Sequence, residues 1–176
     1  MRPSTPDEAL GDNPPSPPVA LEAYERMADL YAAQLATKPH NAFYERPALL
    51  ALLPSLAQKQ VLDLGCGPGL YAEHLLSQGA AHITALDVSP RMVHLASARL
   101  PRERTTVRVA DVSAGVPFLP DRSMDLVIAP LMIHYLPRLG PVFAELGRVL
   151  RPGGHFVFST HHPMAEYPRD SQTGVY

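Results

Sequence analysis

The sequence predicts an α/β fold in which a parallel sheet of about five strands lies between two layers of helices. Three observations support this prediction. Short apolar runs alternate along the chain with stretches of helical periodicity. A turn with three glycines on alternate positions joins the first of these runs, 60–64, to a helical pattern. The next two runs, 82–87 and 107–110, end at or just before an acidic residue, and ligands of parallel sheets bind where strands end.

The composition of the chain narrows the classes of protein to consider. Its 176 residues support one domain with a core of its own, and 46% of them are hydrophobic. We find no apolar run long enough to cross a bilayer and no signal-peptide core, so we expect a cytoplasmic protein without a membrane role. The net charge of −2, with scattered basic residues, predicts no nucleic-acid partner. The single cysteine allows neither an internal disulfide nor a cysteine-based metal site.

The chain is expected to be organised in four stretches around this one core. The first is rich in proline and poor in apolar side chains, which predicts a flexible tail. An amphipathic helix follows at 19–36, and Pro47 can open a second helix after Pro39 has stopped the first. We therefore expect a flexible tail at 1–18, an N-terminal helical segment at 19–58, the core at 59–165 and a C-terminal tail at 166–176.

The glycine turn has the most direct chemical meaning. It reads Asp63-Leu-Gly65-Cys66-Gly67-Pro-Gly69. Glycine takes positive φ and lets the backbone approach a ligand, and the first N–H groups of the following helix are unpaired. The turn therefore suits a ligand with polar or anionic ends, while Asp63 could meet a cationic group. Cys66 has a spacer position inside the turn, and we do not interpret it as a nucleophile.

Asp87 ends the second apolar run about 20 residues after the glycines. In a βαβ unit an acid at this place reaches a ribose, whose two vicinal hydroxyls can donate to one carboxylate. The alternative role is a helix N-cap, but Ser89 followed by Pro90 fits that role better.

The glycine turn resembles the first motif of the class I S-adenosylmethionine (SAM)-dependent methyltransferases, and more closely that of the small-molecule type 11 branch. Later stretches fit the same family in the right order over roughly residues 41–165, including the turn at 150–154. The resemblance implies a Rossmann-like doubly wound sheet, S-adenosyl-L-methionine as the cofactor and S-adenosyl-L-homocysteine (SAH) as its product. It also implies in-line methyl transfer to a small-molecule acceptor, in which positioning of the two reactants dominates.

The resemblance assigns further residues to the cofactor. Val88 and Met92 belong to a run that matches Asp-x-Ser-x-x-Met, and Met92 would pack against the adenine, or else simply belong to the core. Asp111 would accept a hydrogen bond from the adenine 6-amino group, and the N–H of Val112 would donate to a ring nitrogen. The alternative for Asp111 is an ordinary loop aspartate.

The predicted strand at 124–129 leads into the place expected for methyl transfer. Pro130 begins that stretch, and we assign it to the cofactor site. His134 is the titratable group there that suits proton removal near neutrality, which makes it the one candidate catalytic residue. The alternative is a histidine held by hydrogen bonds at the pocket wall. His161 and His162 are adjacent and lack a matching ligand cluster, so we expect them on the substrate side and predict no metal site.

In the family, an N-terminal helical segment often lies over the cofactor as a lid. Tyr44 is accordingly assigned as a cofactor contact, and Tyr31, Asn41 and Arg46 are further candidates. The alternative is that the tyrosines pack in the interior and that Arg46 is a surface charge.

The family fold has seven strands, usually in the order 3-2-1-4-5-7-6, whereas five can be counted in this sequence. Sixteen residues follow Thr160, and they contain no convincing strand, so we expect a chain that lacks the last two strands. The apolar run at 155–160 would then be a sheet edge, which a homodimer or another partner would cover. Two alternative functions remain: an NAD-binding oxidoreductase, although Leu70 stands where that fingerprint has glycine or alanine, and an inactive SAM-binding pseudoenzyme or subunit.

Overall fold

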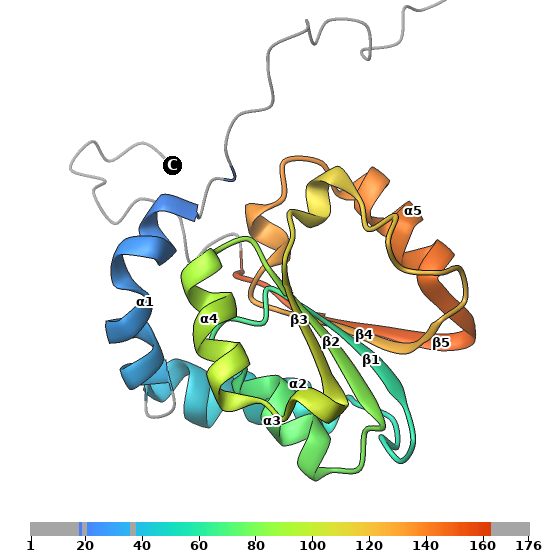
Figure 1. Cartoon of the computed structure of the whole chain (residues 1–176), viewed down its shortest axis with the longest axis horizontal. Coiled ribbons are helices and arrows are strands. Elements are labelled where there is room, and N and C mark those ends of the chain that lie inside the picture. Colours follow the sequence, from blue (N-terminus) through green and yellow to red (C-terminus); the bar gives the residue numbers. More distant parts are fainter. Residues whose placement is uncertain (1–17, 19–20, 36–37, 163–176) are drawn as a thin grey trace, which may run out of the picture.

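The computed structural model describes residue 18 and residues 21–35 and 38–162 of the chain. Of the tails expected at 1–18 and 166–176, every residue except residue 18 lies outside these described residues. A parallel sheet with the strand order β3-β2-β1-β4-β5 forms the centre of the fold (Figure 1). The predicted doubly wound α/β fold is therefore confirmed.

The strands are short and almost all lie where the sequence predicts them. They are β1 (Gln60–Leu64), β2 (His82–Asp87), β3 (Thr105–Val109), β4 (Met124–Pro130) and β5 (Leu150–Ser159). The chain runs outward from β1 to β3 and then returns to the other side of β1 for β4. The carboxyl ends of β1 and β4 therefore meet at the point where the strand order reverses, which is where doubly wound sheets bind ligands.

The helices cover both faces of the sheet. They are α1 (Leu21–Leu35), α2 (Arg46–Ala51), α3 (Leu70–Ser77), α4 (Pro90–Arg99) and α5 (Leu139–Val149), with short helical turns η1 (His40–Glu45), η2 (Arg102–Arg104), η3 (Val112–Ala114) and η4 (Ile133–Tyr135). Helices α2, α3 and α4 lie on one face and α5 on the other, while α1 lies outside α4 (Figure 1).

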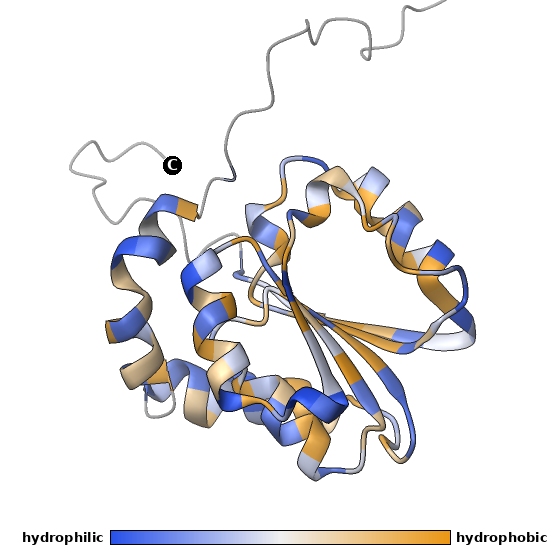
Figure 2. Cartoon of the chain, viewed as in Figure 1, coloured by the Kyte–Doolittle hydropathy of each residue, from blue (hydrophilic) through white to orange (hydrophobic). Residues whose placement is uncertain are grey.

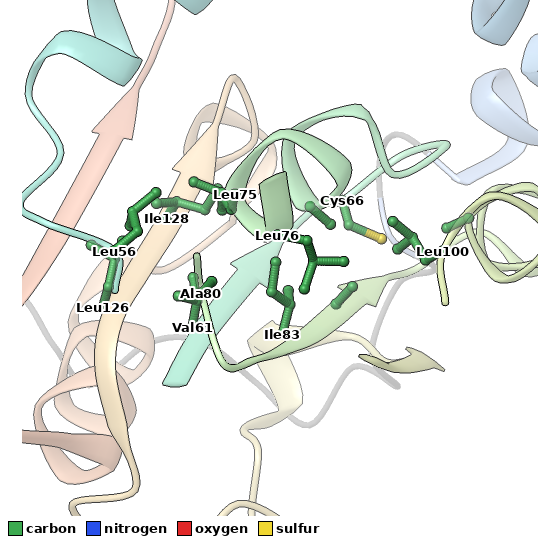
Figure 3. Close-up of a cluster of buried hydrophobic side chains, with 13 residues drawn as sticks. Leu56, Val61, Cys66, Leu75, Leu76, Ala80, Ile83, Leu100, Leu126 and Ile128 are labelled. Atoms are coloured by element: carbon green, nitrogen blue, oxygen red, sulfur yellow. The ribbon is translucent and has the colours of Figure 1, made fainter. Parts of the chain in front are cut away.

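Two separate clusters of buried side chains fill the space between the sheet and its helices. Successive residues of β1 alternate between them, because side chains of a strand point to opposite faces: Val61 joins one cluster and Leu62 the other. The first cluster lies under α3 and joins Leu75 and Leu76 of that helix to Ile83 of β2 and Ile128 of β4 (Figure 3). The middle strands are mostly apolar, and most of the hydrophilic residues lie on the helices, in the loops and near the strand ends (Figure 2).

Helix α1 docks on the N-terminal end of α4 through polar contacts. Glu25 accepts hydrogen bonds from the Ser89 hydroxyl (2.5 Å) and from the Arg91 N–H (3.0 Å). The Arg91 guanidinium also pairs with Asp29 at 2.8 Å. Ala28 of α1 is buried, whereas its neighbour Met27 is 44% exposed.

The helical path after Pro39 begins earlier than the sequence predicts. Pro39 stands at the N-cap of the π-helical turn η1, and η1 continues directly into α2 without the loop expected before Pro47. Leu49 of α2 is buried, whereas Leu52, which follows the last helical residue Ala51, is exposed.

Two details of the last helix and strand differ from the prediction. The Pro-Gly-Gly stretch does not precede β5 as a turn but lies within it, where a register shift separates the Met124–Leu150 pair from the Leu126–His155 pair. A β-bulge of this kind accommodates extra residues in one strand. On α5, Leu146 and Val149 are buried, as expected from their helical spacing, whereas Phe143, expected on the same side, is 41% exposed and Val142 is buried.

Candidate functional site

The glycines of the turn after β1 all take positive φ, but their surroundings differ. Gly65 has φ +67°, and a Cβ added there would lie 2.8 Å from the Cβ of Met132. Gly69 has φ +86° and packs against Leu100, 3.2 Å from such a Cβ. Gly67 has φ +53° and nothing within 4 Å of that position. Two glycines are therefore required by packing, whereas Gly67 presents its backbone to open space, where a ligand can approach it.

Asp87, at the end of β2, is tied to the glycine turn. One carboxylate oxygen accepts from the Gly67 N–H at 2.8 Å, and the other accepts from the Ser89 N–H at 2.9 Å. Burial raises the pKa of Asp87, and these backbone donors partly offset that rise. Ser89 is the N-cap of α4, since its hydroxyl accepts from the Met92 N–H at 3.1 Å. The cap role that was the alternative for Asp87 therefore belongs to Ser89, and Asp87 still has lone pairs for a ligand.

Asp63 is fully buried near the end of β1. Neither of its carboxylate oxygens has a hydrogen-bond partner among the residues that the structure describes. Burial, with a smaller contribution from the negative charge of Asp87, raises the pKa of Asp63 to about 7. A buried carboxyl group without a partner is costly to the fold, so this group marks a place where a cationic or hydrogen-bond-donating ligand would be favoured.

Cys66 lies inside the turn and points into the first core cluster, where its sulfur lies beside Leu100 (Figure 3). Its backbone N–H donates to the Leu86 carbonyl at 3.0 Å, which ties the turn to β2. Burial raises the pKa of the Cys66 thiol well above its ordinary value. A thiol that stays protonated is a poor nucleophile, which agrees with the spacer role expected for Cys66.

The end of β3 brings the next predicted residues beside Asp87. The Ala110 N–H donates to the Asp87 carbonyl at 2.9 Å. Asp111 caps the turn η3, and one of its oxygens accepts from the N–H and the hydroxyl of Ser113, at 2.9 and 2.6 Å. Val112 is buried in the second core cluster. The ends of β1, β2 and β3 thus place Asp63, Asp87 and Asp111 along one edge of the sheet.

Met92 and Val88 occupy less open positions than the acids. Met92 is 1% exposed on the first turn of α4, so the described structure leaves almost none of its surface open to a ligand. Val88 is half-buried between Asp87 and the cap of α4.

A small hollow of about 50 Å³ lies at the glycine turn. The N-terminal segment forms one wall of it, and the turn, the start of α3 and the end of β4 form the rest. Its lining comprises Tyr31, Leu35, Asn41, Glu45, Arg46, Gly65, Cys66, Gly67, Leu70, Tyr71, Pro130 and Leu131. The predicted lid candidates Tyr31, Asn41 and Arg46 therefore do reach the glycine turn, as does Pro130.

A larger hollow of about 600 Å³ lies next to it, between η1, α2 and the end of β5. Its lining is apolar and aromatic with several histidines, and it comprises His40, Tyr44, Glu45, Ala48, Leu49, Leu52, Leu131, Phe158, Ser159, Thr160, His161 and His162. Tyr44 is 71% exposed and lies on this hollow, not on the one at the glycine turn. The structure thus places Tyr44 away from the residues with which the sequence grouped it.

His134 lies on the turn η4 and contacts two residues that line the larger hollow, Thr160 and His161. Its Nδ1 is 3.4 Å from the Thr160 hydroxyl, and its ring stacks on that of His161 with 4.2 Å between the centroids. His161 and His162 line the hollow, as expected for the substrate side. Within the described part of the chain, no group of three or more histidine, cysteine, aspartate or glutamate side chains could hold a metal ion.

Sequence reasoning missed Glu45, which lines both hollows and is 6% exposed. Its two oxygens accept from the Tyr71 hydroxyl, each at 2.9 Å, and one accepts from the Ser159 hydroxyl at 2.5 Å. The one available signal was a carboxylate immediately before Arg46 and Pro47, in a stretch expected to be a loop. Only the helical path from η1 into α2 turns this side chain inward.

The fold and this edge of the sheet define a Rossmann-like α/β protein with a candidate ligand site at a glycine turn. A search of protein families matches residues 62–158 to the type 11 methyltransferase family, described as "Methyltransferase domain". The chain therefore belongs to that family, a branch of the class I SAM-dependent methyltransferases.

Within the described residues, no helix has both the length and the apolar character needed to span a membrane.

Curated relatives and solved structures agree with this assignment. The chain is 32% identical over 145 residues to a malonyl-[acyl-carrier protein] O-methyltransferase of Legionella pneumophila, covering 81% of this chain and 49% of that protein. It is 36% identical over 129 residues to a trans-aconitate 2-methyltransferase of Methylobacterium nodulans, covering 73% and 48%. A SAM-dependent methyltransferase from Mesorhizobium loti superposes with a TM-score of 0.68 at 37% identity, covering 73% of this chain and 57% of that one. The chain spans about half the length of the curated relatives it matches.

Proposed function

We propose that the chain binds S-adenosyl-L-methionine at the glycine turn and takes part in methyl transfer to a small-molecule acceptor. The observation that carries the proposal is Asp63, a buried carboxyl group without a hydrogen-bond partner in the described structure. The amino-acid end of SAM carries an ammonium group, and such a cation would compensate the burial of this carboxylate. The family match supports SAM over NAD, so the oxidoreductase alternative is set aside.

The other residues at the strand ends fit the remaining parts of the same molecule. Gly67 presents its backbone to open space, and Asp87, fixed by Gly67 and Ser89, retains acceptor sites for two ribose hydroxyls. Asp111 and the N–H of Val112 would serve the adenine, with Met92 and Val88 beside it. When bound, SAM supplies a methyl group on a sulfonium, which is a good leaving group. The chain's own task is then to position two reactants and to exclude water.

We propose that the N-terminal segment, residues 19–58, is a lid. The hollow at the glycine turn measures about 50 Å³, whereas pockets for ligands of this size span roughly 300–1,000 Å³. Its wall is formed by Tyr31, Asn41 and Arg46, which belong to this segment. The contacts that hold helix α1 on α4 are mostly polar, such as the pair between Arg91 and Asp29, of which the second is 70% exposed, whereas Leu49 and Leu56 later in the segment are buried. Exposed pairs of this kind contribute little, so helix α1 can move to admit the cofactor.

The larger hollow is the proposed acceptor site. It adjoins the glycine turn through Glu45 and Leu131, and its lining combines apolar side chains with histidines. The named relatives differ in their acceptors, malonyl-[acyl-carrier protein] in one group and trans-aconitate in another, at comparable identity to this chain. Both of these acceptors carry carboxylates, and the malonyl group is attached to a carrier protein, so the names describe those relatives without selecting an acceptor for this chain. His134 would act as a base only for an acceptor atom that carries a proton.

A second candidate function is a SAM-binding subunit or pseudoenzyme that pairs through β5. This strand is the edge of the described sheet, and Phe158 on it is 43% exposed. An exposed apolar edge favours pairing with another chain, whether a second copy or a different partner. A dimer in solution whose formation protects the amides of β5 from exchange would support this candidate.

Calorimetric titration with SAM, SAH and NADH tests the proposal. We expect saturable binding of SAM and SAH, no binding of NADH, and loss of SAM binding in Asp87→Ala. A folded wild-type chain that binds neither SAM nor SAH would overturn the proposed function. Binding of both without transfer to any acceptor would favour the pseudoenzyme.

A further inference from the structure

Two residues, Glu45 and Leu131, line both hollows and so form the partition between the cofactor side and the acceptor side. Leu131 follows β4 with φ +49°, a left-handed conformation that is costly for a residue with a Cβ. Its N–H donates to the Ser159 carbonyl at 3.1 Å, which holds it there. Strained backbone of this kind gathers at functional sites, because the surrounding structure must maintain it.

The Glu45 carboxylate lies between the glycine turn and the end of β5. Tyr71, on the first turn of α3, donates to it from one side, and Ser159, the last residue of β5, donates from the other. These two hydroxyls supply two protons, whereas a carboxylate has about four acceptor sites. Among the described residues Glu45 forms no ion pair. The partition therefore holds a buried negative charge that keeps room for further donors.

The chemistry of the acceptor decides whether such a charge helps or hinders. A carboxylate acceptor would bring a second negative charge against Glu45 in a poorly solvated place, which is strongly unfavourable. A nitrogen acceptor gains positive charge during methyl transfer, and a carboxylate beside it stabilises that developing charge. A donor N–H on the acceptor could also use the unfilled acceptor sites of Glu45.

We propose that Glu45 is a specificity-determining residue that selects an acceptor with a nitrogen nucleophile bearing N–H groups, and that it disfavours carboxylate acceptors. This inference rests on the proposed methyl transfer. In the step, the lone pair of the neutral amine nitrogen forms a bond to the methyl carbon. The carbon–sulfur bond breaks, and its electron pair stays on sulfur. The positive charge thereby moves from sulfur to nitrogen, and the resulting ammonium later releases a proton to solvent.

The test compares two ligands that share an indole skeleton and differ in charge, tryptamine and indole-3-propionate. Each is titrated by calorimetry into the full chain, with and without saturating SAH, because the ammonium of tryptamine has the charge that an acceptor nitrogen carries after transfer. We expect tryptamine to bind about tenfold more tightly. In Glu45→Gln, which keeps the shape and an acceptor oxygen but removes the charge, this ratio should fall to about one.

Two further variants separate selectivity from a role in folding. Tyr71→Phe removes one donor but keeps the charge of Glu45, so the preference for tryptamine should persist. Glu103→Gln makes the same chemical change on the exposed turn η2 and should leave the ratio unchanged. A purely structural Glu45 would lower the affinity for both ligands equally. Three outcomes would overturn the inference: an equal loss of affinity for both ligands, tighter binding of indole-3-propionate than of tryptamine, or no binding of tryptamine at about 10 mM. Failure of SAH to bind would instead overturn the proposed function. The two failures can be distinguished, because the ratio of the affinities for tryptamine and indole-3-propionate is also measured without SAH.

Discussion

The two halves of the site are built in different ways. On the side of β1 and β2, the glycine turn and Asp87 are held by backbone geometry and backbone hydrogen bonds. On the side of β4 and β5, the larger hollow is formed by side chains from η1, α2 and the end of β5. The first half can keep its shape only with particular residues, because positive φ and close approach leave few substitutes. The second half can change its lining without changing the sheet.

This difference matches the two tasks in the proposed reaction, which are binding the cofactor and binding the acceptor. A cofactor common to a family requires one fixed geometry, which the strand ends supply. An acceptor that differs between relatives requires a variable wall, which the N-terminal segment and the end of β5 supply. Substitutions in the first half should therefore cost stability or cofactor affinity, whereas those in the second should change acceptor choice.

The largest expected effect is at Gly65. Gly65→Ala would place a Cβ 2.8 Å from that of Met132 and force alanine to φ +67°. Strain and overpacking together should lower the free energy of unfolding by about 3 kcal/mol in urea denaturation. Gly67→Ala is the matched control, because nothing lies within 4 Å of its Cβ position. It should cost about 1 kcal/mol of stability yet weaken SAM binding. Equal stability losses in the two variants would contradict this account of the turn.

The next effect is a pH dependence that arises from Asp63. Its pKa of about 7 in the folded chain exceeds the unfolded value of about 3.9, so the folded state binds more protons between these limits. The stability that this gives is fully present below about pH 4 and is lost as the pH rises through 7. Between pH 5 and 8 the free energy of unfolding of the cofactor-free wild type should fall by about 2–3 kcal/mol more than that of Asp63→Asn.

Urea denaturation of both proteins at the two pH values measures this difference. Saturating SAH should reduce the wild-type loss, because a bound ammonium would favour the charged carboxylate. Parallel pH dependence in wild type and variant would show that Asp63 is not the group responsible.

A smaller effect is expected for SAM affinity at Asp87. The carboxylate oxygens of Asp87 accept from the Gly67 and Ser89 N–H groups. Asp87→Asn removes the negative charge of this group and leaves one acceptor oxygen where two are used. Calorimetry should show SAM binding weakened by about thirtyfold, equivalent to about 2 kcal/mol. Asp121→Asn, on an aspartate whose side chain is 73% exposed and pairs with Arg148, is the control and should leave the affinity unchanged. An Asp87 variant with wild-type affinity would remove this residue from the site.

The sequence predicts the first half of the site better than the second, and the reason is physical. Glycine spacing and an acid at a strand end are local signals, so the amino-acid pattern alone is enough to locate Gly65, Gly67 and Asp87. The inward turn of Glu45 depends on a π-helical turn that runs into α2, and no local pattern encodes it. Tyr44 lies apart from its predicted neighbours for the same reason, since one residue of helical rotation moves a side chain from one hollow to the other.

The strand order was predictable from the resemblance, whereas the details of its edge were not. The Pro-Gly-Gly stretch has the composition of a turn, yet pairing with β4 continues on both sides of it. Pairing along a neighbouring strand overrides local turn preference, and a bulge absorbs the extra residues. Phe143 also departs from the expected pattern, since it is 41% exposed while Val142, Leu146 and Val149 of the same helix are buried.

The smallest expected effect is at Tyr44, and it sharpens the boundary between the two halves. Its side chain is 71% exposed on the larger hollow, so Tyr44→Ala should change the free energy of unfolding by less than about 0.5 kcal/mol. SAM affinity should stay within about twofold, since Tyr44 does not line the hollow at the glycine turn. Tyr71→Ala is the contrasting variant, because Tyr71 lines that hollow and donates to Glu45. It should weaken SAM binding several-fold by loosening the lid. A large loss of SAM affinity in Tyr44→Ala would mean that the lid turns this tyrosine onto the cofactor when it closes, and the boundary between the halves would then have to include it.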